Sequence, residues 1–434
     1  MSATKTPASQ NQKDDQLDVI VIGGGPAGST TSTLIAKAGY RVQLFERARF
    51  PRFHIGESLI PETYWVLKRL NMLEKMKRSA FVKKCSVQFV NQHGKLSEPF
   101  YFTDHNPHEC SQTWQVLRSE FDQMMLDNAR EHGVEVHEGA RIREVMFEGE
   151  RAVGVRVSHD DGREEEVRAK VVVDASGQSA IIGNRFNLLV KDTSLRKGAV
   201  WTYWKGAYRD KGRDEGATLV LQTKGKKGWF WYIPLHNDIV SVGIVRGFEE
   251  LFAGNQEHEE IYNQELENCP EVKRRVSMGT RCDKFYATKD YSYRARQCAG
   301  DGWVLVGDAY GFLDPLYSSG VLLALRGGSV ASDAIVDGLA KGDTSAAQLG
   351  KWQENFNTGM DRMRRLVIEY YEGFSFGRFI RAYPHLKGHV TDLLIGNLFN
   401  DQVGEVFGPM DEMRKQMEMQ AAAAPATLAA AATK

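Results

Sequence analysis

The chain has 434 residues, enough to bury a large core in two subdomains or in one elaborated domain. Its 56 basic and 56 acidic residues give a formal net charge of zero, so no global field favours nucleic acid or an anionic membrane surface. The polar start, residues 1–15, lacks the apolar segment of a signal peptide, and no apolar run is long enough to span a bilayer. Five scattered cysteines without C-x-x-C spacing indicate reduced thiols and no zinc site. We therefore expect a cytoplasmic protein with no metal, no nucleic-acid partner and no membrane partner.

The first motif lies near the N-terminus. Residues 17–22 (LDVIVI) form a β-branched apolar run that is typical of a strand buried on both faces of a parallel sheet. The run leads into residues 23–28 (GGGPAG), which fit the pattern G-x-G-x-x-G. A helical stretch over 29–38 and a second strand over 41–45 follow, and this strand ends at Glu46. Strand, glycine loop, helix, strand and acid in this order predict a dinucleotide-binding unit.

Each glycine of this loop has a physical role. Gly23 permits the tight turn, Gly25 lets backbone N–H groups approach a pyrophosphate, and Gly28 lets the helix pack closely on the strand. Glu46 follows roughly 20 residues after the glycines, where an acidic side chain binds the ribose hydroxyls of an adenosine. A glycine-rich turn without a ligand is the alternative interpretation, and the ordered set of elements disfavours it.

The rest of the first half alternates between helical and strand patterns. We interpret the strands as a β-meander inserted in the dinucleotide-binding sheet. The predicted elements are a helix over 57–80, strands over 81–102 with a turn at 92–95, an amphipathic helix over 115–131, and strands over 134–137, 142–157 and 169–174.

The second half predicts a second sheet and a helical end. Residues 198–245 are rich in aromatic and β-branched side chains, which favours an antiparallel sheet that forms a platform for a substrate. Two charged turns interrupt it, at 209–216 and 224–228; we expect solvated hairpin edges, with a phosphate site as the less favoured alternative. Further predicted elements are a buried strand over 302–306, a helix over 320–341, a largely helical stretch over 349–419 and a low-complexity tail over 421–434.

Two further segments follow predicted strands and carry an aspartate. Asp174 begins D-A-S-G after one strand, and Asp308 lies in G-D-A-Y-G-F after another. Together with the glycine loop, these segments resemble the FAD-binding pattern of flavoprotein monooxygenases; a helix N-cap is the alternative role for Asp308. In that family the aspartate of the G-D pair contacts the ribityl chain, and Arg118 matches an arginine that lies near the FAD. The resemblance assigns FAD contacts to Gly23, Gly25, Pro26, Ala27, Gly28, Glu46, Arg47, Arg118, Asp174, Asp308 and Phe312.

Two longer segments resemble the flavin-dependent halogenases. Residues 50–61 (FPRFHIGESLIP) are similar to the F-P-R-x-H-x-G-E-S-L segment of that family, and residues 228–234 (GWFWYIP) match its W-x-W-x-I-P motif. Trp229 and Trp231 share one face of a strand because side chains alternate along it. In the family these residues, with Pro234, form a wall between the flavin and the organic substrate; an aromatic core stripe is the alternative.

A third segment indicates a catalytic lysine. Residues 81–86 resemble G-F-x-x-K-x-G of the family, with Lys84 in register for the lysine and Lys83 as the less favoured candidate. Ala80 and Ser86 stand where the family has glycines. Desolvation in an apolar tunnel would lower the pKa of such a lysine. It could then hydrogen-bond hypohalous acid or be halogenated at nitrogen, and the sequence does not separate these roles; a solvated surface lysine is the alternative.

The segment over 314–320 (DPLYSSG) resembles the family's halide-binding turn. Backbone amides near Ser319 and Gly320 would face an anion at a helix N-terminus. Tyr317 stands where tryptophan halogenases have a glutamate, and the chain is shorter than is usual for them, which favours the branch that acts on phenols and pyrroles. His54 could serve as a general base, although a structural imidazole near the flavin is the favoured role.

The resemblance implies an FADH2-dependent halogenase with an α/β fold: a Rossmann-like FAD-binding domain of the p-hydroxybenzoate-hydroxylase type, an antiparallel-sheet substrate region and a helical C-terminal part. A separate flavin reductase would supply FADH2, and a flavin C4a-hydroperoxide and chloride or bromide would give hypohalous acid that reaches a phenol-type ring through the lysine. The substrate could be a free small molecule or tethered to a carrier protein. The expected parts are a disordered N-terminus (1–15), the two parts of the FAD-binding domain (16–195 and 296–345), the substrate region (196–295), the helical region (346–420) and a disordered tail (421–434).

Three alternatives to a halogenase are compatible with the FAD-binding segments. A flavin-dependent aromatic hydroxylase or a prenyl-type reductase would share the FAD segments, and a non-catalytic flavin-binding relative is the third alternative. The halide preference and the oligomeric state are not readable from the sequence. Candidates for the lining of a substrate pocket are Trp201, Tyr203, Trp204, Tyr370, Tyr371, Phe374 and Phe376.

Overall fold

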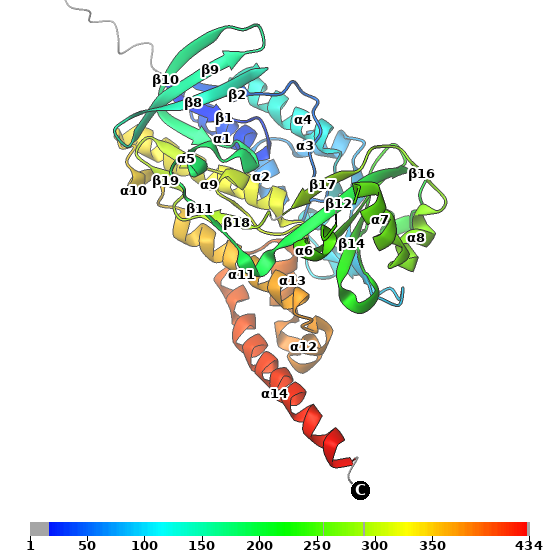
Figure 1. Cartoon of the computed structure of the whole chain (residues 1–434). Helices are drawn as coiled ribbons and strands as arrows, with labels where there is room; N and C mark the ends of the chain where they lie inside the picture. The colour runs from blue at the N-terminus through cyan, green and yellow to red at the C-terminus, as the bar shows by residue number, and fades with distance from the viewer. Residues whose placement is uncertain (1–16, 255, 290, 432–434) are drawn as a thin grey trace, which may run out of the picture.

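A computed structural model describes residues 17–254, 256–289 and 291–431, and it contains two large sheets. The N-terminal expectation of disorder over 1–15 lies outside these residues. The first sheet has the order β19-β20-β10-β1-β2-β7, with parallel pairing from β20 to β7. Two long strands, β8 and β9, extend it through β10 (Figure 1). The strands are β1 (Leu17–Ile22), β2 (Val42–Glu46), β7 (Glu135–Glu138), β8 (Ala140–Glu148), β9 (Arg151–His159), β10 (Glu164–Asp174), β19 (Ala299–Gly300) and β20 (Trp303–Leu305).

Helix α1 (Pro26–Lys37) packs on this sheet between α4 (Arg118–Glu131) and α9 (Ser319–Lys341). The apolar residues 19–22 of β1 and 171–173 of β10 are buried, as their apolar runs predict, whereas the charged first half of β10 is largely exposed. Within the described part of the chain α9 alone is long and apolar enough to cross a membrane, but 72% of its most apolar window is buried inside the protein. Its hydropathy is therefore that of a core helix.

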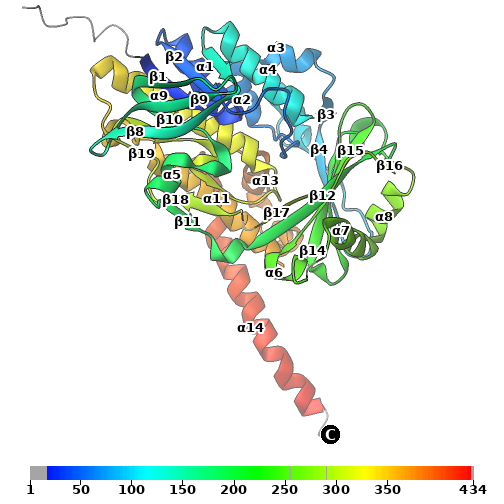
Figure 2. The same ribbon diagram turned by 45° about the horizontal axis from the view of Figure 1, so that its top comes forward.

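The second sheet has the order β16-β12-β15-β14-β13-β4-β5, with β17 on β12 (Figure 2). Alternate residues of β14 lie in two different cores: one face packs toward the first sheet and the other toward α7 (His258–Glu267) and α8 (Pro270–Val276). The strands are β4 (Ser86–Val90), β5 (Phe100–Tyr101), β12 (Lys197–Lys205), β13 (Thr218–Gln222), β14 (Gly228–Pro234), β15 (Ile239–Gly247), β16 (Thr280–Arg281) and β17 (Tyr286–Lys289).

Smaller elements join the two sheets. A two-stranded ribbon pairs β3 (Val82–Lys84) with β6 (Thr113–Gln115), and a three-stranded sheet has the order β11-β18-β21. Helices of the C-terminal part cover one side, and α14 projects away from the body (Figure 1). The remaining elements are β11 (Leu189–Lys191), β18 (Tyr293–Ala295), β21 (Gly311–Phe312), α2 (Thr63–Arg69), α3 (Leu73–Arg78), α5 (Ile181–Arg185), α6 (Phe248–Leu251), α10 (Ala346–Leu349), α11 (Gln353–Tyr371), α12 (Phe376–Ala382), α13 (Lys387–Ile395) and α14 (Phe407–Ala431).

Three expectations differ from this architecture. The helix expected over 57–80 is two helices, α2 and α3, because Asn71 between them adopts a left-handed conformation with φ 60°. The strands over 81–102 do not join the dinucleotide-binding sheet as a meander, because β4 pairs in parallel with the distant β13. The alanine-rich end continues α14 to Ala431, since alanine is the strongest helix former.

Candidate active site

The glycine loop has the shape that its pattern predicts. Gly23 has φ +102°, and a Cβ at Gly28 would lie 1.9 Å from the carbonyl oxygen of Gly23. Both positions therefore need glycine, the first for its backbone conformation and the second for the close approach of α1 to β1. Beside Gly25 only the Arg52 guanidinium lies within 4 Å of a Cβ position. The third glycine thus leaves a polar space open at the N-terminus of α1, where Pro26 and Ala27 begin the helix.

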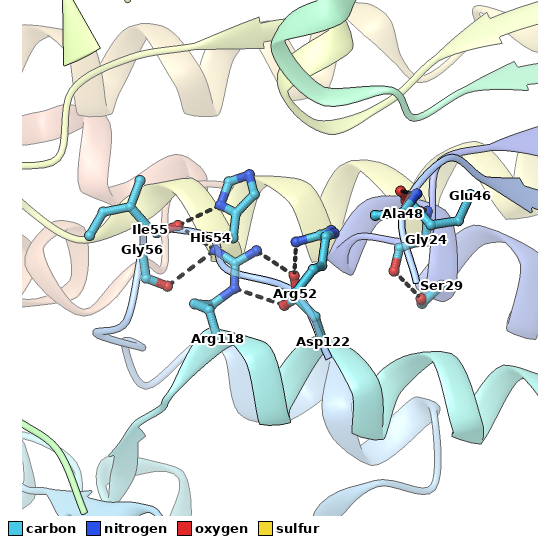
Figure 3. A network of polar contacts seen from close by, with 10 residues as sticks. All are labelled: Gly24, Ser29, Glu46, Ala48, Arg52, His54, Ile55, Gly56, Arg118 and Asp122. Atoms are coloured by element: carbon cyan, nitrogen blue, oxygen red, sulfur yellow. Dashed lines mark hydrogen bonds and ion pairs between the residues drawn. The ribbon is translucent and has the colours of Figure 1, made fainter. Parts of the chain in front are cut away.

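The acid at the end of β2, Glu46, holds this loop. The two oxygens of the Glu46 carboxylate accept hydrogen bonds from the backbone N–H of Gly24 (2.8 Å) and of Ala48 (2.9 Å), and the Ser29 hydroxyl donates to the Gly24 carbonyl (Figure 3). Arg47 is exposed and forms no ion pair within the described part of the chain. Glu46 and Arg47 therefore stand beside the loop, where ribose and adenine would lie.

Arg118 is part of a buried ion cluster at the start of α4. Its guanidinium makes two hydrogen bonds to Asp122, at 2.7 and 2.9 Å, and Arg52 binds the same carboxylate at 3.1 Å (Figure 3). Arg118 also donates to the carbonyls of Ile55 and Gly56. Burial opposes the charge of Asp122, but the Arg118 guanidinium holds the pKa of the carboxyl below its ordinary value. The cluster fixes the loop over 50–61 against the cofactor side of the sheet.

His54 belongs to the same loop and lies near Arg118. Its Nδ1 is 2.8 Å from the carbonyl oxygen of Ile55, so this nitrogen carries the proton (Figure 3). The His54 residue is partly exposed to solvent. The protein around it, followed by the Arg118 charge, lowers the pKa of His54, so the imidazole is neutral at pH 7. This suits a structural imidazole and leaves Nε2 free as an acceptor.

The two aspartates that follow strands have different surroundings. Asp174 is completely buried, and its carboxylate accepts hydrogen bonds from the amides of Ser176 and Ile182. It therefore shapes the turn after β10. The Asp308 carboxylate makes no hydrogen bond within the described residues, and burial raises its pKa to about 6 despite the Arg118 charge. Asp308 is thus the aspartate with oxygens available to the hydroxyls of a ligand.

These features fit an FAD molecule. The cradle at Gly25 and the N-terminus of α1 suit a pyrophosphate, Glu46 and Arg47 stand on the adenosine side, and the unengaged carboxylate of Asp308 suits a ribityl chain. Within the described residues no cluster of three or more metal-ligating side chains occurs.

Lys84 is completely buried, whereas Lys83 next to it is exposed. Because side chains alternate along β3, the ribbon with β6 turns one lysine inward and the other outward. The Lys84 ammonium group donates to the Ser58 hydroxyl (2.8 Å) and to the Leu59 carbonyl (2.9 Å). Burial lowers the pKa of Lys84 to about 7, since no carboxylate of the described residues pairs with it. A neutral amine is therefore accessible near physiological pH.

A hydrogen-bonded chain continues behind this lysine. The Ser58 and Thr218 hydroxyls are 2.9 Å apart, and the Gln115 side-chain amide donates to Thr218 (2.8 Å) and to the Gly216 carbonyl (3.0 Å). All three side chains are buried. Sequence reasoning missed Thr218 and Gln115, and only Ser58 had a signal, as the serine of the G-E-S-L segment.

A narrow cavity of about 20 Å³ lies beside the Lys84 side chain, with room for a molecule about as large as water. Three of its lining residues, Phe89, Tyr317 and Leu394, also line a second cavity of about 750 Å³. The second cavity has the volume of a small-molecule site. It is lined in addition by Trp229, Tyr370, Tyr371, Phe374 and Phe376.

The tryptophans of β14 form a continuous aromatic wall. Trp229 and Trp231 lie on one face with ring centres 6.4 Å apart, and Trp201 of β12 packs against Trp231 at 6.0 Å. The Trp231 ring lies across Gly243 of β15, where a Cβ would be 2.2 Å from it. The planes of Trp229 and Trp231 are tilted by 57°, so the wall is not flat. Pro234 ends the strand and is buried.

One pocket candidate is on the wrong face. Trp204 lies an odd number of positions from Trp201 and Tyr203 along β12, so its side chain is on the opposite face of the sheet. There it packs in the second core, and its indole nitrogen donates to the Tyr262 hydroxyl. Tyr203 donates at 2.6 Å to Glu57, a buried carboxyl whose pKa burial raises to about 7. Sequence reasoning gave Glu57 no role.

The turn over 314–320 precedes the 23-residue helix α9. Ser318 adopts a left-handed conformation with φ 57°, and the helix begins at Ser319, which is buried. The first amides of a helix have no partner within it, so those near Ser319 and Gly320 point out of the N-terminus. A Cβ at Gly320 would be 3.1 Å from the Phe312 ring, which therefore covers this end. The arrangement suits a small anion.

The family model described as tryptophan halogenase matches residues 18–117 and 92–375. The chain is 34% identical over 362 residues to the tryptophan 2-halogenase of Chondromyces crocatus, over 82% of this chain and 67% of that protein. It is 32% identical over 387 residues to the 1H-pyrrole-2-carbonyl peptidyl-carrier-protein brominase of Pseudoalteromonas luteoviolacea, over 88% and 92%. The solved structure of the flavin-dependent brominase Bmp2 superposes with a TM-score of 0.83 at 29% identity, over 93% of this chain and 100% of that one. The present chain thus has the fold of the FAD-dependent halogenases. It belongs to the flavin-dependent halogenase family, whose enzymes use FAD and chloride or bromide.

Proposed function

We propose that this enzyme halogenates an electron-rich aromatic ring of the phenol or pyrrole type, with Lys84 as the residue that transfers the halogen. The observation that carries the proposal is the position of the Lys84 amine. It is completely buried beside a narrow cavity, and three residues that line this cavity also line the large one. Lys83 is exposed and lines neither cavity, so it becomes the control residue.

Each part of the chain has a separate task in this mechanism. The amides near Ser319 and Gly320 hold the halide at the N-terminus of α9. Reduced FAD, delivered by a separate flavin reductase, supplies with oxygen the oxidising power that turns halide into hypohalous acid. The wall of Trp229 and Trp231 keeps the organic substrate away from the flavin side. The cavity beside Lys84 is small, which favours a reactant of a few heavy atoms such as hypohalous acid.

The hydrogen bonds of Lys84 favour halogenation at nitrogen. A neutral amine has two N–H groups, and Lys84 has two acceptors, the Ser58 hydroxyl and the Leu59 carbonyl. Both N–H groups are then used, and the lone pair is the direction left for a reactant. The amine displaces hydroxide from the halogen of hypohalous acid, and the N–H proton and the hydroxide leave as water. The substrate ring then takes the halogen, loses its own proton and restores the amine.

The large cavity indicates what kind of ring enters. Its inner part is aromatic and apolar, and Tyr317 lies at the boundary with the Lys84 cavity. No carboxylate of the described residues lines the small cavity, so an indole would lack an acidic group to orient it. A phenol activates its own ring and needs no such group. Tryptophan is the second candidate substrate, because the chain is similar to a tryptophan 2-halogenase.

The outer part of the large cavity is basic. Lys95, Lys226 and Lys227 line it, all three are exposed and none forms an ion pair within the described residues, while Glu372 is the acidic residue of the lining. This excess of positive charge favours a substrate whose far end is anionic, either a carboxylate or the phosphate of a carrier-protein arm. Two relatives are named for a carrier-bound pyrrole, which supports the second form.

Mass spectrometry of products tests the proposal. The purified protein is given FAD, a flavin reductase, NADH, oxygen and bromide or chloride, with a panel of phenols, pyrroles and tryptophan. We expect a halogenated phenol or pyrrole that disappears in Lys84→Ala and survives in Lys83→Ala. A hydroxylated product, or loss of activity in both variants alike, would contradict the assigned role of Lys84, and activity on tryptophan alone would contradict the substrate class.

A further inference from the structure

A buried hydrogen-bond chain joins the aromatic wall to the halide turn. The indole N–H of Trp229 donates to the Tyr371 hydroxyl at 3.0 Å, and this hydroxyl lies 3.1 and 3.2 Å from the two carboxylate oxygens of Asp314. The tryptophan can only donate and an ionised carboxylate can only accept. The direction of the chain is therefore fixed from Trp229 through Tyr371 to Asp314.

Asp314 carries this chain into the turn. One of its oxygens also accepts from the backbone N–H of Leu316 (2.9 Å), two residues on. The residue is 1% exposed, and burial raises the pKa of its carboxyl to about 6, so the ionised form predominates at pH 7. The Lys197 ammonium lies 3.9 Å from the centre of the Tyr371 ring and lowers the pKa of Asp314, which offsets its buried charge. Three groups thus hold one carboxylate in place.

We propose that Tyr371 is a positioning residue whose hydroxyl fixes Trp229 of the wall and the halide turn over 314–320 in one arrangement. Tyr371 lines the large cavity and sits at the end of α11, so it is the point where the substrate side meets the halide side. The inference rests on the proposed function, because it assumes that the turn binds halide. It adds that the halide site depends on a hydroxyl and an indole that lie outside the turn.

The chain offers a matched control beside this residue. Tyr370 precedes Tyr371 on α11 and lines the same cavity, but its hydroxyl makes no hydrogen bond to Asp314 or Trp229. Tyr370→Phe and Tyr371→Phe remove the same atom from neighbouring positions. A difference between the two variants therefore measures the hydrogen-bond chain and not the loss of a tyrosine from the cavity.

The first test is steady-state kinetics with bromide varied at a saturating concentration of a phenol that the wild type halogenates. Tyr371→Phe removes the hydrogen bonds that join this hydroxyl to Trp229 and to Asp314, and we expect it to raise the KM for bromide by about tenfold, with a smaller change in the KM for the phenol. Tyr370→Phe should change the bromide KM by less than about twofold. Equal bromide KM values in the two variants would overturn the proposal.

The second test is a double-mutant cycle. Trp229→Phe keeps an aromatic ring in the wall but removes the N–H, and it should also raise the bromide KM. Combined with Tyr371→Phe it should add nothing further, because both remove the same link. Effects that multiply would show that the two residues act separately and would overturn the link between them.

A third measurement does not need turnover and so separates this inference from the halogenase mechanism. Bromide that binds the folded protein raises Tm, and the shift is compared in sodium bromide and sodium gluconate at equal ionic strength. The wild type and Tyr370→Phe should show the bromide-dependent shift, and Tyr371→Phe should lose most of it. A wild type that does not respond, or a Tyr371→Phe variant that responds fully, would overturn the inference even where product formation is intact.

Discussion

The burial of Lys84 should cost the enzyme stability that a single substitution restores. The pKa of Lys84 is about 7, against 10.5 for a free lysine. Between these two pH values the unfolded chain holds a proton on this residue that the folded chain does not, so the stability of the wild type rises with pH across this window. Each pH unit corresponds to about 1.4 kcal/mol, which gives a penalty of about 4 to 5 kcal/mol at pH 7.

Lys84→Met removes the titrating group and keeps most of the volume. It also loses the hydrogen bonds to Ser58 and Leu59, a cost of about 1 to 3 kcal/mol. The variant should therefore be inactive but more stable than the wild type at pH 7 by about 2 kcal/mol, and this advantage should shrink and reverse by pH 10.5. Urea unfolding of both proteins at a series of pH values measures it, with the exposed Lys83→Met as the control that shows no trend. A difference between Lys84→Met and the wild type that is independent of pH would refute the assignment of a desolvated amine.

Three further predictions concern other parts of the site. Gly28→Ala places a Cβ 1.9 Å from the Gly23 carbonyl oxygen and should abolish FAD binding, as flavin fluorescence titration would show; near-normal affinity would contradict the tight packing of α1 on β1. Asp122→Asn leaves the buried Arg118 without its carboxylate and should destabilise the fold by about 3 to 5 kcal/mol at pH 7, with a smaller difference as the pH falls below 4. Lys226→Glu should raise the KM for an anionic or carrier-bound aromatic substrate several-fold and leave the KM for a neutral phenol unchanged. Equal effects on both KM values would show that the lysines of the large cavity do not recognise the charge of the substrate.

Local patterns predict the shape of the glycine loop at the candidate FAD site. The requirement for glycine at positions 23 and 28 follows from the strand–loop–helix sequence, and the structure shows the close contacts that impose it. The choice between Lys83 and Lys84 also has a local basis, because alternation along a strand sends neighbours to opposite sides. Alternation alone does not say which of the two lysines points inward. The pairing of β3 with β6 determines this, and it turns Lys84 toward the interior.

The rest of the site depends on contacts between distant segments. Ser58 meets Thr218 across 160 positions, and Trp229 meets Tyr371 across 142. Ser58 forms a β-bridge with Gln115, whose amide reaches Thr218 of β13, and no periodicity within these separate segments encodes the contact. Trp204 shows that composition alone is not enough. Its aromatic neighbourhood predicted a pocket residue, but its position along β12 places its side chain in the second core.

The narrow cavity beside Lys84 also bears on how long one enzyme molecule can work. Hypohalous acids oxidise thiols and thioethers faster than they attack most other side chains. The chain has 5 cysteines and 13 methionines, yet the described lining of this cavity contains neither type, only aliphatic, aromatic and hydroxyl side chains around the amine. Cys85 is the next residue after Lys84 and does not line it. In the proposed mechanism the reagent beside Lys84 therefore meets no thiol or thioether, and we expect the number of turnovers before self-inactivation to depend on how rarely it reaches the sulfur atoms outside this cavity.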